Sequence, residues 1–369
     1  MNTMDNLNFE DIEVNLKNYI SNLEIEDFNF KPSNTGSSTN GRKLQLGFLC
    51  YALKTMYILN DSRLENEEYV GEVVNKINSF QTKEKNKFQA YYVDENYKKA
   101  FQKIYPKNLL KNTIKFFLLR IKFNEINPNK KLMEFLRAET KQSIATISQF
   151  KKSPEIAFDN YPKDEAEVKK FISKLDWRFP WNAGAQVAGI CVFMSFDKNK
   201  ENLSYFMDLE IVKFVKPDGA YYRGIVENQS EKINGAMKVI SGLDWLNIPI
   251  HKPKELIDLC LSHEPNSEGC DIVDVIYVLF KCFEQTDYKK NEIKDYIEKL
   301  IPKIMTHYKK DEGGFSYYSN KTQEFYYGVK ISEGKDEADI HGTTLLTWAL
   351  SMAFLILGHP YPSWRIIKP

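Results

Sequence analysis

The sequence lacks an excess of either charge and lacks a long apolar run. Lys and Arg number 51 and Asp and Glu 50 in 369 residues, and the two signs are interspersed along the chain. Proteins that bind nucleic acid or anionic membranes show a basic surface patch, so neither partner is expected. The N-terminal residues MNTMDNLNFEDIEV contain no basic and apolar leader, and no stretch reaches about 18 uncharged apolar residues. We therefore expect a cytoplasmic protein without a transmembrane segment.

Linkers and regularly spaced cysteines are also scarce. No stretch rich in Pro, Gly and Ser separates two halves, and residues 31–40 (KPSNTGSSTN) are the one low-complexity candidate, which we interpret as a loop after an N-terminal helix. The five cysteines are an odd number, lie far apart and sit mostly in apolar segments, which predicts buried thiols. With 43% apolar and 14% aromatic residues, the chain can fill one large core, and we expect a single domain over residues 1–369.

Two kinds of helical segment alternate along the chain. Residues 165–175 and 292–308 carry an apolar stripe at helical spacing and a polar face, as outer helices do. The second kind is apolar nearly all round and rich in small residues; it comprises residues 44–59, 138–150, 183–194, 233–245, 271–283 and 340–357. Such helices must be covered on every side. The pattern predicts an all-α fold, an (α/α)6 toroid of about six helix pairs with the apolar helices as its inner ring.

Loops with glycine and aromatic residues precede several of the apolar segments, at residues 181–184, 218–222 and 312–318. Their irregular spacing resembles helix-pair repeats with insertions, whereas open solenoids keep a regular period. A closed toroid therefore fits this chain better than an open scaffold. Residues 315–331 alternate well enough to predict a small β-hairpin around residues 319–322, which we place at the mouth of the barrel.

Three ionisable residues at the starts of apolar helices are candidate catalytic groups. Asp271 and Asp274 lie three positions apart, so their carboxylates share one helix face. If both face a cavity, desolvation and repulsion raise one pKa and leave a proton-donating acid beside an anion. Alternatively, Asp271 caps its helix and Asp274 faces solvent. The positive helix end disfavours the charged form of His341, which predicts a neutral imidazole that accepts a proton or binds a metal. Alternatively, His341 is structural; Gly342 beside it permits a close approach of a ligand or of another backbone segment.

Residues 181–358 resemble the superfamily of terpenoid cyclases and protein prenyltransferases, which share an α/α toroid. Residues 274–277 (DVIY) occupy the place of the zinc-binding Asp-x-Cys-Tyr motif, residues 339–342 (DIHG) resemble the helix start that carries the zinc-binding His, and residues 312–315 (EGGF) are similar to the family's Gly-Gly-Phe loops. Ile276 stands where the zinc thiolate belongs, and only Cys270 offers a substitute. The resemblance therefore implies zinc with an incomplete ligand set.

The cyclase motifs are incomplete as well. Residues 271–274 (DIVD) keep the outer two acids of the Asp-x-Asp-Asp motif with which class II terpenoid cyclases protonate an alkene. The pair His341-Gly342 matches part of the Cys-His-Gly motif of the lanthionine cyclases, with Ile340 in place of the Cys. The resemblance implies the fold and points to an isoprenoid cyclase or prenyltransferase activity, with Asp271 and Asp274 as acids and His341 as base.

Carbohydrate chemistry is the alternative, because α/α barrels with aromatic and acidic linings also serve epimerases, lyases and hydrolases. Paired tyrosines in loops can stack on sugars or line a pocket for an isoprenoid cation, or simply alternate between core and solvent. A non-catalytic toroid that only binds is the third interpretation. The candidate substrate-binding residues, for a small molecule or a glycan, are Trp181, Asn182, Tyr221, Tyr222, Arg223, Asn234, Tyr317, Tyr327 and Glu139.

Overall fold

The computed structural model describes residues 8–86, 88–104, 128–359 and 364–369, with side chains from residue 131 onward in the third range. Over these ranges the protein is mostly helical, with small two-stranded sheets only. The named helices are α1 (Phe9–Leu23), α2 (Leu46–Ile58), α3 (Glu67–Asn78), α6 (Pro128–Gln149), α7 (Glu165–Lys174), α8 (Pro180–Met194), α9 (Lys200–Ile211), α10 (Gln229–Trp245), α11 (Pro253–Leu261), α12 (Gly269–Gln285), α13 (Lys290–Met305) and α14 (Ile340–Leu357), with short 3-10 turns at Ser62–Glu65 and Val212–Phe214. The all-α prediction is confirmed.

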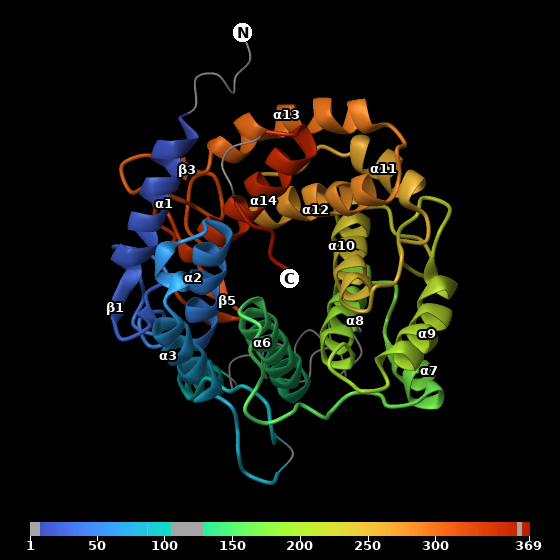
Figure 1. The fold of residues 1–369 in the computed structure, drawn as a ribbon, viewed down its shortest axis with the longest axis horizontal. Coiled ribbons are helices and arrows are strands. Elements are labelled where there is room, and N and C mark those ends of the chain that lie inside the picture. The colour runs from blue at the N-terminus through green and yellow to red at the C-terminus, as the bar shows by residue number, and fades with distance from the viewer. Residues whose placement is uncertain (1–7, 87, 105–127, 360–363) are drawn as a thin grey trace, which may run out of the picture.

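Every segment predicted to be apolar all round forms a helix, and the bounds predicted for residues 340–357 are those of α14. We call α2, α6, α8, α10, α12 and α14 the inner helices. Contacts link α2 to α6, α6 to α8, α8 to α10, α10 to α12, α12 to α14, and α14 back to α2. Figure 1 shows these helices surrounding the centre of the molecule. The cycle of contacts explains why such apolar helices have no face left for solvent.

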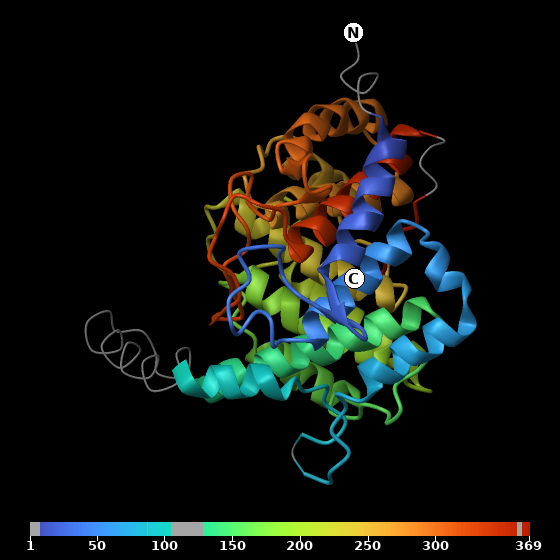
Figure 2. The ribbon, with the colours of Figure 1, turned by 90° about the vertical axis from the view of Figure 1, so that its left-hand side faces the viewer.

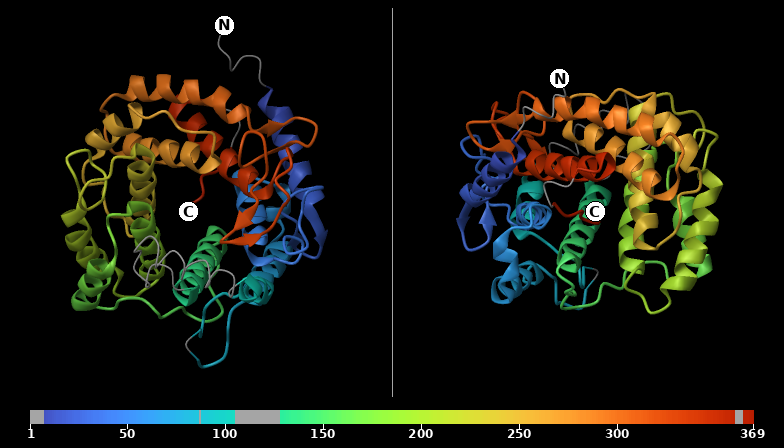
Figure 3. Two further views of the ribbon diagram at one scale, coloured as in Figure 1. Left: turned by 180° about the vertical axis from the view of Figure 1, so that it is seen from behind. Right: turned by 45° about the horizontal axis from the view of Figure 1, so that its top comes forward.

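The amphipathic helices pack on the outside of this cycle. Contacts join α1 to α2 and α14, α3 to α2 and α6, α9 to α8, α11 to α10 and α12, and α13 to α12 and α14, while α7 packs on α9. Figure 3 shows the same arrangement from behind and from a tilted direction, and Figure 2 shows α1 lying across the outside of the molecule. The predicted outer segments become α7 and α13, which bury apolar stripes that include Val168 and Ile172 in α7 and Ile293 and Ile297 in α13.

The predicted hairpin over residues 315–331 is wrong in its pairing. Phe315 belongs to β4 (Gly314–Phe315), which pairs with β3 (Tyr308–Lys309), and the hairpin forms farther along between β5 (Phe325–Tyr326) and β6 (Val329–Lys330). The turn residues Tyr327 and Gly328 both have positive φ, 44° and 85°, as the tight turn of a two-residue hairpin requires. The region predicted as the turn makes one isolated bridge instead. The other sheet pairs β1 (Glu24–Glu26) with β2 (Asn29–Phe30).

The polar loop at residues 31–40 connects β2 to the approach of α2 and is fixed in place. The buried carboxylate of Glu337 accepts hydrogen bonds from the backbone N–H of Thr35 (2.9 Å) and of Gly36 (2.6 Å). A backbone bridge also joins Ser33 to Asp339. The loop is therefore an anchored connection, packed against the segment that leads into α14.

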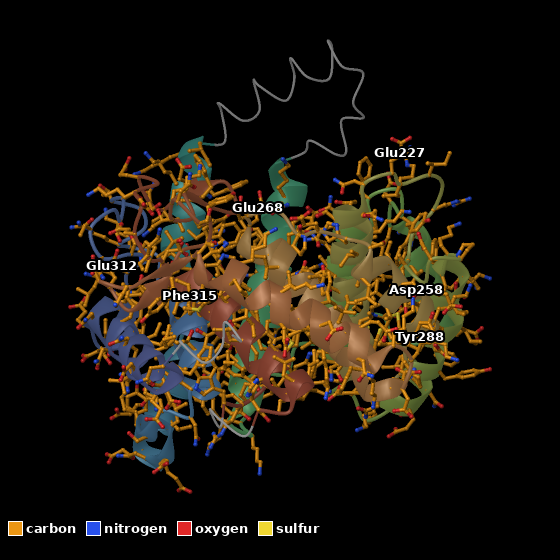
Figure 4. All side chains as sticks on the ribbon, turned by 90° about the horizontal axis from the view of Figure 1, so that it is seen from above. Glu227, Asp258, Glu268, Tyr288, Glu312 and Phe315 are labelled. Atoms are coloured by element: carbon orange, nitrogen blue, oxygen red, sulfur yellow. The ribbon has the colours of Figure 1, made fainter. Side chains whose placement is uncertain are left out.

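Residues 364–369 cross the carboxyl ends of several inner helices. The Arg365 N–H donates to the carbonyl of Ile58 at the end of α2, Gln149 at the end of α6 donates to the carbonyl of Lys368, and the Trp245 indole at the end of α10 donates to the carbonyl of Pro369. Figure 1 places this segment in the centre of the view. Helices α2, α6 and α10 therefore have their carboxyl ends on one side. Figure 4 shows Glu227 and Glu268, which lie just before α10 and α12, toward one common edge.

Helix α14 is long and apolar enough to span a membrane by length and composition, at 18 residues. In this fold 78% of it is buried, between α2, α12 and α13. A mostly buried core helix passes the same test, so α14 agrees with the expectation of no transmembrane segment.

Candidate functional site

His341, on the first turn of α14, lies between two aromatic rings. Its imidazole stacks on Tyr51 of α2 and on Tyr317, with ring centroids 4.6 and 5.1 Å apart and the planes about 20° from parallel. Its Nδ1 lies 2.8 Å from Oε1 of Gln323. An amide oxygen only accepts, so Nδ1 carries the proton and Nε2 keeps its lone pair. Burial, reinforced by the charges of Lys238 and Lys54, lowers the pKa of His341 to about 3, so the ring is neutral near pH 7.

Asp339 positions this histidine. Its Oδ1 accepts from the Gly342 N–H (2.8 Å) and caps α14, while its Oδ2 accepts from the N–H groups of Tyr317 (2.7 Å) and Gln323 (3.2 Å). One carboxylate thus fixes the helix start and two neighbours of the imidazole. The close approach predicted at Gly342 is made by the protein's own loop, because a Cβ there would overlap the backbone nitrogen of Tyr317.

Asp274, on α12, is a buried carboxylate without hydrogen-bond partners in the described chain. It is 1% exposed, and neither of its oxygens has a hydrogen-bond partner among the residues that the structure describes. Nζ of Lys238, on α10, lies 3.7 Å from its Oδ1. Burial raises the pKa of Asp274 to about 6, while the charge of Lys238 opposes that rise. The solvent-facing alternative for Asp274 is wrong, because the side chain is enclosed.

Asp271 has a different environment from Asp274. Its Oδ1 accepts from the Ser230 hydroxyl, and its Oδ2 accepts from the Asn266 N–H (2.8 Å) and lies 3.2 Å from Nε2 of His263. In the orientation that satisfies its amide, Asn234 also donates to Oδ1 of Asp271 (3.3 Å). Burial raises the pKa of Asp271, but these hydrogen bonds outweigh burial and hold it below the usual value. Asp271 and Asn234 therefore secure the loop before α12, and Asp271 is an anion rather than a proton donor.

Two lysines on other inner helices, Lys54 and Lys238, act electrostatically on Lys141 of α6. Lys54 of α2 and Lys141 of α6 have no ion pair or hydrogen bond with any residue in the described ranges, and Lys54 is 7% exposed. Burial lowers the pKa of both, and the charges of Lys54 and Lys238 lower that of Lys141 further. We call Lys54, Lys141 and Lys238 the central lysines, and together with Asp274, His341 and Glu139 they form the central cluster.

Glu139 on α6 belongs to the central cluster because its charge acts on Lys54. It is 2% exposed and accepts a hydrogen bond from the Tyr326 hydroxyl. Burial raises the pKa of Glu139 to about 8, with the charge of Asp94 adding to the shift and Lys54 opposing it. Glu139 is therefore mostly protonated at neutral pH. Tyr327, next to this pair, is 52% exposed, and its ring packs edge-on against Phe135 at 5.0 Å.

The remaining candidate binding residues make their contacts elsewhere. The Tyr221 hydroxyl pairs with Nδ1 of His251 (3.1 Å), and the Tyr222 hydroxyl donates to Asp218 (2.9 Å). Trp181, Asn182 and Arg223 are exposed. None of these five makes a hydrogen bond, ion pair or ring contact with a member of the central cluster in the described chain. Among the other predicted residues, Tyr317 stacks on His341, and the charge of Lys238 acts on both Asp274 and His341.

The implied zinc site does not fit these residues. Within the described ranges no three His, Cys, Asp or Glu side chains gather as a zinc ion requires. The ammonium of Lys238 lies beside Asp274, and burial raises the pKa of the Cys270 thiol to about 11, which disfavours the thiolate that zinc binds.

A separate pocket of about 280 Å³ opens between the end of α2, α3 and the end of α6, lined by residues that include Tyr57, Val70, Phe150 and Arg365. It contains no member of the central cluster.

Comparisons of the chain with protein-family models, with curated proteins and with solved structures find no match. The function must therefore be inferred from the residues themselves.

Proposed function

We propose that this chain is an α/α-toroid enzyme that cyclises or isomerises an isoprenoid-like substrate by proton transfer, with Asp274 as acid and His341 as base. The closed cycle of contacts among the inner helices supports the toroid. The observation that carries the proposal is the enclosed carboxyl of Asp274, whose two oxygens have no hydrogen-bond partner in the described chain. Burying such a group unsatisfied is costly, and active sites are where that cost is retained.

The proposed reaction begins with protonated Asp274. With a pKa of about 6, roughly a tenth of the carboxyl is protonated at pH 7. Its proton and the electron pair of an alkene form a new C–H bond and leave a carbocation on the neighbouring carbon. The faces of Tyr51 and Tyr317, which flank His341, stabilise positive charge.

His341 completes the cycle. Its Nε2 lone pair takes a proton from a carbon beside the cation, and the electrons of that C–H bond form the new C=C bond. Substrate and product are isomers, and exchange with water returns a proton to Asp274 and removes one from His341. The neutral state of the imidazole is what this step requires.

The surroundings favour an apolar substrate in the ring. Aromatic residues flank the base, and residues 364–369 cover the carboxyl ends of α2, α6 and α10. A carbohydrate-active enzyme is the second candidate, which the polar groups of Glu139 and the central lysines support. The two candidates differ in the ligands that they would accept.

Deuterium incorporation tests the proposal. The pure protein is incubated in D₂O with polyprenyl substrates, as diphosphates and as free alcohols, and the products are analysed by mass spectrometry. We expect carbon-bound deuterium in an isomerised product, lost with Asp274→Asn and with His341→Ala. Asp258→Asn is the matched control, because Asp258 lies on the outside beside Tyr288, as Figure 4 shows, and pairs with Lys289.

Two results would count against the proposal. One is an absence of deuterium in every polyprenyl product, combined with deuterium exchange in nucleotide sugars or uronic-acid oligosaccharides, which would favour the carbohydrate-active candidate. The other is full incorporation by Asp274→Asn, which would remove Asp274 from the reaction.

A further inference from the structure

We propose that the pocket between α2, α3 and α6 binds a small ligand that carries one aromatic ring and one phosphate monoester group. We call this cavity of about 280 Å³ the end pocket, because it lies where α2 and α6 end. Its volume is near the lower limit of the roughly 300–1,000 Å³ typical of ligand pockets, which suits a single substituted ring. None of the residues that line it takes part in the proposed reaction, so the inference stands independently of the proposed function.

The first observation is the charge on the wall of the end pocket. Three cationic residues line it, Lys151 and Lys152 just after α6 and Arg365 near the C-terminus. All three are exposed, and their side chains make no hydrogen bond or ion pair with a residue that the structure describes. The one acid in the lining is Glu67, at the start of α3. Three cations and one carboxylate leave two positive charges, which match the charge of about −1.5 to −2 on a phosphate monoester at pH 7.

The second observation is that Arg365 is held in place while its donors stay free. Its backbone N–H donates to the carbonyl of Ile58 (2.8 Å), and its guanidinium carbon lies 5.2 Å from the centre of the Tyr57 ring. The aromatic face supports the plane of the guanidinium, whereas no described residue accepts a hydrogen bond from its side chain. A planar guanidinium with free N–H groups can bind a phosphate through two parallel hydrogen bonds, so Arg365 is the expected anchor of the anion.

The third observation is the aromatic and apolar part of the wall. The rings of Tyr57 and Phe150 meet edge to face, with centroids 6.1 Å apart and planes at 87°. Both residues line the end pocket and are only partly buried, and Leu64 and Val70 add apolar surface. Aromatic rings favour a ligand ring that stacks on them or packs edge-on. The uncharged part of the ligand is therefore a flat ring, which lies beside the cations.

The fourth observation is the backbone of Lys151, whose φ is positive at 56°. Helices commonly place glycine at such a position just after their last turn, because a Cβ is strained there. Lys289 has the same conformation, with a φ of 50°, and its ammonium pairs with Asp258. Lys151 has no such partner in the described ranges. An anionic ligand in the end pocket would give this lysine the partner that Lys289 has within the chain.

The experiment titrates the full-length protein with phenyl phosphate, using calorimetry and thermal unfolding at constant ionic strength. Inorganic phosphate supplies the anion without the ring, phenol supplies the ring without the anion, and benzoate supplies a ring with a carboxylate. The variants are Arg365→Gln, Arg365→Lys and Lys151→Gly. Arg365→Lys keeps the charge and loses the planar arrangement of donors. Lys289→Gly is the matched control, because it removes a lysine of the same backbone conformation away from the end pocket.

We expect phenyl phosphate to bind the wild type and Lys289→Gly more tightly than the other three probes do, and to raise the unfolding temperature of both proteins. The affinity should fall at least about tenfold in Arg365→Gln and Arg365→Lys, because the paired charge-assisted hydrogen bonds are lost. It should fall about threefold in Lys151→Gly, as for the loss of one exposed charge. Without ligand, Lys151→Gly should unfold near the wild-type temperature, since glycine suits the positive φ. Its weaker binding then does not come from a loss of folding.

The proposal is overturned if phenyl phosphate does not bind the wild type, or binds the Arg365 variants as tightly as it binds Lys289→Gly. A role of Arg365 limited to stabilising the ends of α2 and α6 predicts that second result, together with a lower unfolding temperature for Arg365→Gln. Tighter binding of benzoate would replace the phosphate by a carboxylate and overturn the assigned class. Equal binding of inorganic phosphate or of phenol would overturn it too, by removing the ring or the anion from the ligand.

Discussion

Nζ of Lys238 lies 3.7 Å from Oδ1 of Asp274, and this ion pair joins α10 to α12. The distance is too long for a strong hydrogen bond, so Lys238 attracts the carboxylate without satisfying it. Opposing effects therefore set the acidity of Asp274: burial and the charge of Asp271 favour the neutral acid, and the lysine charge favours the anion.

Removing Asp274 should change the pH dependence of stability in one direction. Its pKa is about 6 in the folded protein and about 3.8 without the fold, so its contribution is fully present below pH 4 and is lost as the pH rises through 6. Relative to Asp274→Asn, the wild type should lose roughly 2 kcal/mol of unfolding free energy between pH 4 and 7. Urea unfolding of both proteins across that range measures the difference, and parallel curves would show that Asp274 titrates normally.

Lys238→Met should move this transition upward. Without the ammonium, burial and the charge of Asp271 act on Asp274 unopposed, and its pKa should rise above 6. The unfolding free energy of Lys238→Met is compared with that of the double variant Lys238→Met/Asp274→Asn across the pH range. The midpoint of the change in this difference should lie at a higher pH than the midpoint measured in the wild-type background. Lys232→Met is the control, because Lys232 on the same helix pairs with Asp218 instead. An unchanged midpoint would mean that Lys238 does not act on Asp274.

Asp339→Ala should destabilise the protein and disorder the base. The variant removes three hydrogen bonds to backbone N–H groups, at the start of α14, at Tyr317 and at Gln323. We expect a loss of about 2–4 kcal/mol, more than for an exposed cap, because the N–H groups stay buried. Chemical denaturation measures the loss. Asp164→Ala, at the exposed cap of α7, should cost about 1 kcal/mol, and equal costs would contradict the positioning role.

Two glycines provide a matched test of packing around His341. A methyl group on Gly342 would overlap the backbone of Ser316 and Tyr317, whereas one on Gly189 of α8 meets nothing within 4 Å. Gly342→Ala should therefore lower the unfolding temperature and separate α14 from its loop. Gly189→Ala should be neutral or stabilise by up to about 1 kcal/mol, since alanine favours the helix. Comparable unfolding temperatures for the two variants would contradict the close contact at Gly342.

The sequence predicts the helices better than it predicts the site. Segments with no polar face had to be enclosed, and residues 340–357 illustrate this, since their composition alone defined α14. The pairing of Phe315 was not predictable in the same way, because strands of two residues carry too little periodic signal.

The central lysines also carry a signal in the sequence. Lys54 is the one charged residue of α2, and Lys238 stands in a similarly apolar stretch of α10. A single charge on a helix that must be enclosed is itself a functional indication. Tyr51 and Gln323 left no such mark, because their meeting with His341 depends on the packing of segments far apart in the chain.

The contact between α2 and α14 brings together residues almost 300 positions apart. An open stack of helix pairs has two end units, each supported from one side, and can lose an end unit while the rest survives. In a closed cycle every inner helix is supported from both sides, so no unit is dispensable. Loop-closure entropy is paid before the α2–α14 contact forms, and we expect this junction to form late in folding and to separate early under stress.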